Sequence, residues 1–119
     1  MSKPEDLRDR TKRFALRVFK LFRSLPKSDE GRIMGKQLLR CGTSVAANYR
    51  AVCRARSKDE FVAKMGVVIE EADESVFWME FLVDTGMVPK PRLEKLLAEG
   101  NELVAIFVAS RKTAKRNED

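Results

Sequence analysis

The sequence predicts an all-α protein, an antiparallel up-and-down bundle of four helices. Apolar residues recur at alternating intervals of four and three in four separate segments, which is the spacing of helices that pack side by side. Short links with Gly, Pro or Ser separate these segments, and no segment shows the alternation of period two that is typical of strands. Because 119 residues is the length of one domain, we expect a single domain over residues 1–119.

The first two helices are expected over residues 4–25 and 29–55. Pro26 stops the first helix, and Ser28 or Asp29 can cap the second by accepting hydrogen bonds from its first free amides. The core stripe of the first helix consists of Leu7, Phe14, Val18, Leu21 and Leu25.

The second helix carries an apolar stripe that is interrupted by an amide. The members of the stripe are Met34, Leu38, Cys41, Val45, Asn48, Val52 and Ala55. Because a core amide must be hydrogen-bonded, we interpret Ser44 and Asn48 as a polar part of the core that fixes register and partner choice, with ligand contact as the alternative. Gly35 and Gly42 are poor helix formers, which indicates a close backbone approach or a local bend.

The third helix is expected over residues 58–84, after a capping box formed by Ser57 and Glu60. It shows two adjacent apolar stripes, which is more than one bundle of four helices is expected to cover. We therefore expect a homo-oligomer, and the candidate interface residues are Phe19, Phe22, Val62, Ile69, Val76, Trp78 and Phe81. The fourth helix is expected over residues 91–112, with a fraying end from Arg111 onward.

The net charge of +6 is divided unevenly along the chain. Residues 1–64 contain 17 Lys and Arg against 7 Asp and Glu, whereas residues 65–119 contain 7 against 11. A basic surface concentrates polyanions, so RNA, DNA or an anionic membrane surface are candidate partners, and ordinary solvated charge is the alternative. Tyr49 is the one aromatic residue placed for stacking on a base. The candidate nucleic-acid contacts are Arg13, Arg17, Arg40, Arg50, Arg54, Arg56 and Lys58.

The sequence argues against several classes of enzyme. It contains no histidine, so neither a Ser-His-Asp nor a Cys-His nucleophile can form within the chain. The acidic run at residues 70–74 lacks the His of ferritin-type di-metal sites. We expect these acids to pair with arginines of the second helix (Arg40, Arg50 or Arg54) or of a neighbouring subunit, and a carboxylate-only cation site is the alternative. There is also no glycine-rich phosphate loop, which argues against nucleotide hydrolysis. Taken together, these observations predict no catalytic residue, no cofactor and no metal.

The cysteines and the start of the chain indicate a compartment. Cys41 and Cys53 lie on one predicted helix, roughly 18 Å apart at 1.5 Å per residue, which is too far for a disulfide. The stretch of the first ten residues is charged rather than apolar. The longest run without a charged residue, 41–49, has nine residues. We therefore expect no signal peptide, no membrane span and a cytoplasmic location.

Two neighbouring segments of the sequence resemble a known family. The first, residues 37–48, reads Gln-Leu-Leu-Arg-Cys-Gly-Thr-Ser-Val-Ala-Ala-Asn, and the second, residues 54–61, reads Arg-Ala-Arg-Ser-Lys-Asp-Glu-Phe. They are similar to the bacterial four-helix proteins named for 23S rRNA intervening sequences, although Leu39 stands where an arginine is common. The resemblance implies a bundle that assembles into a ring, typically a pentamer, without known enzymatic activity. It also implies kinship with the accessory protein of diversity-generating retroelements, a basic pentameric barrel that binds nucleic acid and a reverse transcriptase.

Two functions are expected from these observations. The first is a non-enzymatic, ring-forming accessory protein that binds nucleic acid, RNA above all, through a basic surface without reading sequence. The alternative is a protein-interaction scaffold that recruits an enzyme such as a reverse transcriptase and does not bind nucleic acid directly. A metal-dependent enzyme that uses the carboxylates of the third helix is a distant third hypothesis.

Overall fold

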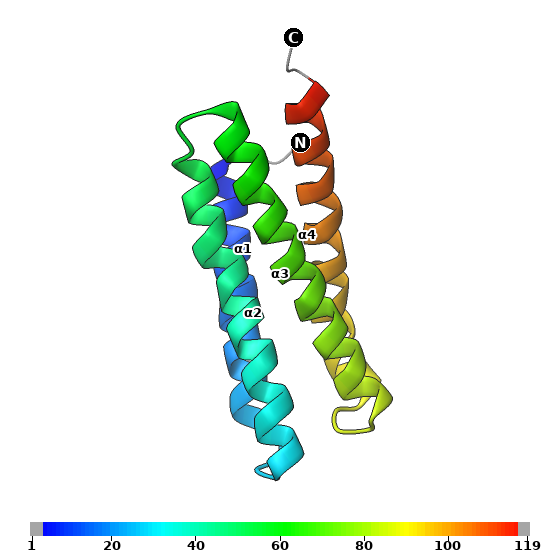
Figure 1. Ribbon diagram of the computed structural model, residues 1–119. Helices are drawn as coiled ribbons and strands as arrows, with labels where there is room; N and C mark the ends of the chain where they lie inside the picture. The colour runs from blue at the N-terminus through cyan, green and yellow to red at the C-terminus, as the bar shows by residue number, and fades with distance from the viewer. Residues whose placement is uncertain (1–3, 117–119) are drawn as a thin grey trace.

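Four helices run up and down in the computed structural model, which describes residues 4–116. They are α1 (Pro4–Ser24), α2 (Asp29–Cys53), α3 (Lys58–Asp84) and α4 (Lys90–Arg116). The link between α2 and α3 lies at the same end of the bundle as the start of α1 and the end of α4, and the other two links lie at the opposite end (Figure 1). The predicted all-α four-helix bundle is therefore confirmed, whereas its assembly into a ring stays a prediction. The ends of the predicted domain, residues 1–3 and 117–119, lie outside the described residues.

The helices begin where their caps predict. The hydroxyl of Ser28 accepts a hydrogen bond from the amide of Gly31 (3.1 Å), and that of Ser57 accepts one from the amide of Glu60 (3.0 Å). These bonds satisfy amides that have no partner inside the helix, which fixes the first turns of α2 and α3. The first two helices end one and two residues earlier than predicted.

The fourth helix is longer than predicted, so the expectation that it frays from Arg111 is wrong. It continues to Arg116 because Arg111 is half-buried against α3 and its Nε donates to the carbonyl of Val62 (3.0 Å). This contact joins residues 49 positions apart in the sequence, and it holds the end of α4 in place.

The core of α1 follows the sequence pattern. All five residues of its predicted stripe are buried, and Thr11 is buried among them. The hydroxyl of Thr11 donates to the carbonyl of Arg8 in the preceding turn (3.1 Å), so this buried polar group is satisfied within its own helix.

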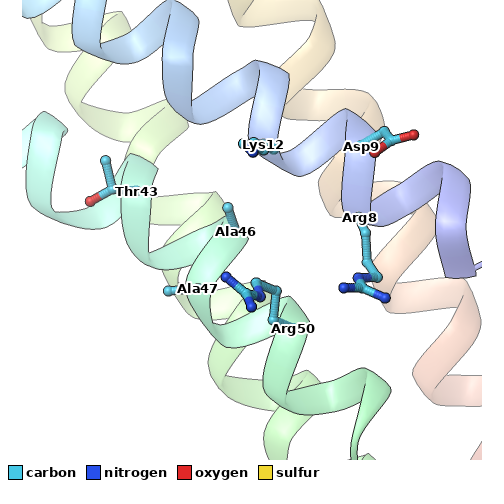
Figure 2. Close-up of a pocket in the computed structure, with 7 residues that line it drawn as sticks. All are labelled: Arg8, Asp9, Lys12, Thr43, Ala46, Ala47 and Arg50. Carbon is cyan, nitrogen blue, oxygen red and sulfur yellow. The ribbon is translucent and has the colours of Figure 1, made fainter.

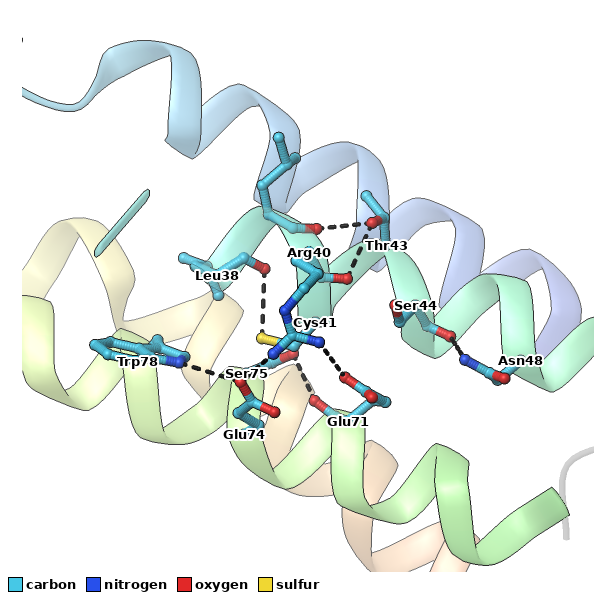
Figure 3. A network of polar contacts seen from close by, with 11 residues as sticks. Leu38, Arg40, Cys41, Thr43, Ser44, Asn48, Glu71, Glu74, Ser75 and Trp78 are labelled. Carbon is cyan, nitrogen blue, oxygen red and sulfur yellow. Dashed lines mark hydrogen bonds and ion pairs between the residues drawn. The ribbon is translucent and has the colours of Figure 1, made fainter. Parts of the chain in front are cut away.

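The buried stripe of α2 contains Tyr49 in place of the predicted Asn48. Tyr49 is only 4% exposed, and its ring stacks on Phe107 of α4 with the centroids 5.7 Å apart. Asn48 and Ser44 are half-buried, and Asn48 Nδ2 donates to the carbonyl of Ser44 (2.8 Å), inside the same helix (Figure 3). A strict alternation of four and three residues drifts by about 20° per heptad around a straight helix. The buried stripe of α2 corrects this drift with two successive intervals of four residues, which keep it facing the core. The interpretation of Tyr49 as an exposed stacking residue is therefore wrong.

Two glycines let α1 and α2 pack closely. A Cβ at Gly42 would lie 2.8–3.1 Å from three side-chain atoms of Val18, and one at Gly35 would lie 2.9–3.3 Å from Leu25 and Phe22. The close approach that the sequence indicates is thus a property of this helix pair. Between residues 4 and 116, none of the helices combines the length and the apolar character needed to cross a membrane.

Candidate nucleic-acid interface

A groove of about 550 Å³ separates the first half of α1 from the second half of α2. Its residues come from both helices: Arg8, Asp9 and Lys12 from α1, and Thr43, Ala46, Ala47 and Arg50 from α2. The groove opens where α2 presents the small side chains of Ala46 and Ala47. Figure 2 shows Arg8 pointing from α1 toward α2, Arg50 rising from α2, and Asp9 pointing away from the groove.

The groove carries an excess of positive charge. Three cations line it against one carboxylate. Among the side chains of residues 6–116, no acidic group lies within ion-pair distance of Arg8, Lys12 or Arg50. Cations at the wall of a concave surface that no described side chain neutralises concentrate anions such as phosphate groups.

Arg50 is the one predicted contact that lines this groove. Arg54 follows it at the C-terminal cap of α2, and Arg56 and Lys58 lie in and just after the link to α3. Arg13 is exposed on α1, and Arg17 faces α4 in a different cleft. The predicted residues are therefore spread over several surfaces of the bundle and do not form one cluster.

Arg40 was predicted as a nucleic-acid contact, but its charge is used inside the protein. Its guanidinium bonds to Glu71 (3.4 Å) and to Glu74, both on α3 (Figure 3). Glu74 also accepts a hydrogen bond from Trp78 Nε1 (3.4 Å). Two carboxylates offset the charge of one cation, so Arg40 contributes less to an anion-binding surface than the cations that line the groove. The same contacts confirm that acids of the third helix pair with an arginine of the second.

Arg56 is partly compensated by the capping box of α3. Glu60 accepts a hydrogen bond from the backbone amide of Arg56 (2.6 Å), and the Arg56 side chain, 90% exposed, lies 3.8 Å away from the Glu60 carboxylate. The backbone hydrogen bond is the main cause that lowers the pKa of Glu60, and the nearby charges of Lys64 and Arg56 act in the same direction. Glu60 is therefore ionised at neutral pH and offsets part of the charge of Arg56.

Sequence reasoning missed Arg8 and Lys12 as partners of Arg50. The signal was available in the antiparallel order of the first two helices, since the start of one must lie beside the end of the other. The sequence alone does not give the register between these two helices. In the structure, the close packing of Val18 against Gly42 sets it.

The predicted interface residues differ in how exposed they are. Val76 is 6% exposed and packs where α4 carries Gly100, so it belongs to the core and the prediction is wrong for this residue. The partly buried candidates Phe22, Val62 and Ile69 lie at the edge of the core. Phe19 and Phe81 are exposed, and Phe19 has the guanidinium of Arg23 5.7 Å from its ring centroid.

An aromatic cluster on α3 contains one residue that the sequence did not single out. Phe77, Trp78 and Phe81 lie with ring centroids 5.0–5.9 Å apart, and Phe77 and Phe81 are 51% and 40% exposed. We call these three residues the aromatic cluster. Like Trp78 and Phe81, Phe77 lies outside the two predicted stripes of the helix, but it was not among the predicted interface residues.

The acidic residues do not assemble into a metal site in the part of the chain that the structure describes. There, no group of three or more His, Cys, Asp or Glu side chains is placed to hold a metal ion. Glu71 and Glu74, the half-buried acids of the run at residues 70–74, are bound to Arg40.

Comparisons with known proteins agree with this architecture. The family model described as 23S rRNA-intervening sequence protein matches residues 5–109. A solved structure from Bacteroides thetaiotaomicron, described as a protein with unknown function from the S23 ribosomal protein family, is 29% identical. It superposes with a TM-score of 0.86 over 93% of this chain and 99% of its own. No curated protein matches the sequence. A family match over most of the chain and a shared four-helix fold lead to one conclusion: the chain belongs to the 23S rRNA-intervening sequence protein family.

Proposed function

We propose that this protein is a non-enzymatic, homo-oligomeric accessory protein that binds RNA through the groove between α1 and α2. The observation that carries the proposal is the set of three cations in that groove, Arg8, Lys12 and Arg50, which lack ion-pair partners among residues 6–116. The family name refers to an insert in rRNA, which is consistent with RNA as the polyanion but does not identify it.

The expected binding is independent of sequence and sensitive to salt. Lysine and arginine contacts to phosphates release condensed counter-ions, so the binding constant falls as salt rises. The described groove has no exposed ring beside its cations, because Tyr49 is stacked on Phe107 in the core. Without base stacking, affinity rests on phosphate contacts, and the protein is expected to discriminate poorly among bases.

The first prediction tests the groove with a charge-matched pair of variants. Replacing Lys12 and Arg50 with Gln removes two groove cations, and replacing Lys112 and Lys115 with Gln removes the same charge from the exposed end of α4. Fluorescence anisotropy with a labelled single-stranded RNA is measured from 50 to 300 mM salt. We expect the groove variant to reduce the slope of log K against log salt by about 1.4, at about 0.7 per phosphate contact. The α4 variant should keep the slope of the unmodified protein.

An equal loss in both variants would mean that binding follows net charge and not the groove. Absence of RNA binding by the unmodified protein at 50 mM salt would reject the proposed function.

A second candidate function, a scaffold for protein partners, is favoured by the aromatic cluster. Three neighbouring rings at the surface of α3 are the kind of apolar feature that marks an interaction site. We propose that copies of this chain associate through it, as in the ring, typically a pentamer, that the family resemblance implies. Recruitment of an enzyme such as a reverse transcriptase belongs to this alternative, and it would proceed without RNA in the groove.

A further inference from the structure

A second cleft lies on the other flank of α1. It has a volume of about 360 Å³, is open to solvent, and is lined by the second half of α1 and the first turns of α4. Four cations line it: Arg17 and Lys20 from α1, and Arg92 and Lys95 from α4. The cleft exists because α1 and α4 pack against each other less extensively than any of the helix pairs that are neighbours in the sequence.

No described carboxylate balances the positive charge of this cleft. No carboxylate lines it, and within the described part of the chain none of its four cations has an ion pair. Toward the other end of the same two helices, by contrast, a cation is paired with carboxylates. There Arg10 bonds to Glu99 (2.7 and 3.1 Å) and to Glu102 (3.0 Å), and the hydrogen bond to Glu99 is the main cause that raises its pKa. Between α1 and α4, one cation is thus neutralised, and four have no ion-pair partner among the described side chains.

The floor of the cleft is apolar. Leu21, Leu93 and Leu96 belong to the core and close the bottom, with Pro91 at the edge. Flexible cations around an apolar floor suit a ligand with several negative charges and a flat apolar part. The volume falls in the range of small-ligand pockets, of roughly 300–1,000 Å³, but is far below that of a nucleic-acid duplex.

We propose that this cleft binds a compact anion that carries two or three linked phosphate groups, either a nucleoside polyphosphate or an inorganic polyphosphate. The four cations contact the phosphate oxygens, and two arginines can each bind an oxygen pair through their planar guanidinium groups. The site binds and does not hydrolyse its ligand, because it contains no general base and no phosphate-activating loop. This inference does not depend on RNA binding in the groove between α1 and α2.

The test is isothermal titration calorimetry with inorganic triphosphate and, separately, with adenosine triphosphate, at 150 mM salt without metal. We expect saturable binding of one ligand per chain. Replacing Arg92 and Lys95 with Gln, or Arg17 and Lys20 with Gln, should weaken binding at least tenfold. The variant with Gln at positions 112 and 115, which loses the same charge elsewhere on α4, should change binding less than twofold.

The two probes distinguish the sources of the ligand. Tighter binding of adenosine triphosphate indicates a nucleotide whose base lies on the apolar floor, whereas equal affinities indicate recognition of the phosphates alone. Both results support the proposal. The pairs of variants lie on different helices, so agreement between them excludes a local folding defect as the cause. Removing cations from the first turns of α4 is also not expected to weaken the helix, because cations oppose its dipole there.

Three results with the unmodified protein, the control variant and the cleft variants would overturn the proposal. They are the absence of saturable binding to the unmodified protein, equal weakening in the control variant, and undiminished binding in both cleft variants. The groove variant with Gln at positions 12 and 50 should bind triphosphate normally. Loss of triphosphate binding in that variant would also contradict the proposal, because it would assign the anion to the groove.

Discussion

At the scale of single residues, the two cysteines of α2 have opposite environments. Cys41 is fully buried, and its thiol donates to the carbonyl of Leu38 (3.5 Å; Figure 3). Burial disfavours the charged thiolate and is the main cause that raises the pKa of Cys41. Cys53 is exposed at the end of the helix. Because the thiolate is the reactive form, the two side chains should react at very different rates.

Thiol titration with Ellman's reagent at pH 8 should therefore release one equivalent rapidly from the native protein and a second only after denaturation. The variant Cys53→Ser should lose the rapid phase, and Cys41→Ser should keep it. Rapid release of two equivalents from the native protein would show that Cys41 is accessible, which contradicts its place in the core.

Residue identities in the core were predictable only as far as the repeat holds. Leu7, Phe14 and Val18 follow from spacing alone, because the intervals of α1 alternate regularly. Tyr49 and Asn48 are adjacent, and spacing could not decide between them. The choice depends on how α2 is rotated against α4, where Phe107 provides a surface for the tyrosine ring.

At the scale of helices, the contact between α1 and α2 depends on the absence of a side chain at Gly42. Val18 is β-branched and fully buried, so it cannot move away easily from an added methyl group. Gly66 of α3 offers the matched comparison. A Cβ there would lie 3.6–3.9 Å from the guanidinium of Arg111, which is ordinary contact distance.

We expect Gly66→Ala, but not Gly42→Ala, to stabilise the protein. Alanine favours a helix by up to about 1 kcal/mol over glycine, so Gly66→Ala should raise the free energy of unfolding. At Gly42 this gain is outweighed by overpacking, which costs about 1–3 kcal/mol, so Gly42→Ala should be neutral to destabilising by about 2 kcal/mol. Urea denaturation followed by circular dichroism measures both changes. Stabilisation by Gly42→Ala equal to that by Gly66→Ala would contradict the close packing of α1 and α2.

Helix boundaries were predictable where local chemistry sets them. Ser28 and Ser57 could be identified from the sequence because a cap bonds to an amide three residues away. The last turn of α4 could not be predicted, because it depends on the contact of Arg111 with Val62, which is distant in the sequence. The groove likewise depends on how two separate helices pack against each other. Arg50 was predictable as a basic candidate, but its neighbours on α1 depend on the register between two helices.

At the scale of the whole molecule, the basic groove and cleft lie on other helices than the aromatic cluster. The two flanks of α1 carry the basic groove and the basic cleft. The aromatic cluster lies on α3, which also carries Glu70, Asp73 and Glu80 as exposed acids. Surfaces of opposite charge on one chain favour head-to-tail contacts between copies, and such contacts close into rings when the rotation allows it.

We expect the unmodified protein to be larger than its 13.6 kDa chain mass in sedimentation equilibrium. Replacing Phe77 and Phe81 with Ala should shift it toward the monomer, because the exposed rings supply apolar area for the contact. Replacing the exposed aliphatic residues Ile33 and Val108 with Ala is the control, and it should leave the mass unchanged. A monomeric unmodified protein at high concentration would reject self-association, and an unchanged mass after loss of both rings would reject this surface.

The single tryptophan of the chain gives this surface its own optical signal. Trp78 is half-buried between Phe77 and Phe81, and its indole nitrogen donates to Glu74. Its emission therefore comes from the aromatic cluster alone, without contributions from other indoles. Covering the cluster would exclude water from the ring, move the emission to shorter wavelength and protect it from quenching by iodide. Dilution of the unlabelled protein in a fluorimeter would thus report whether this face of α3 is occupied.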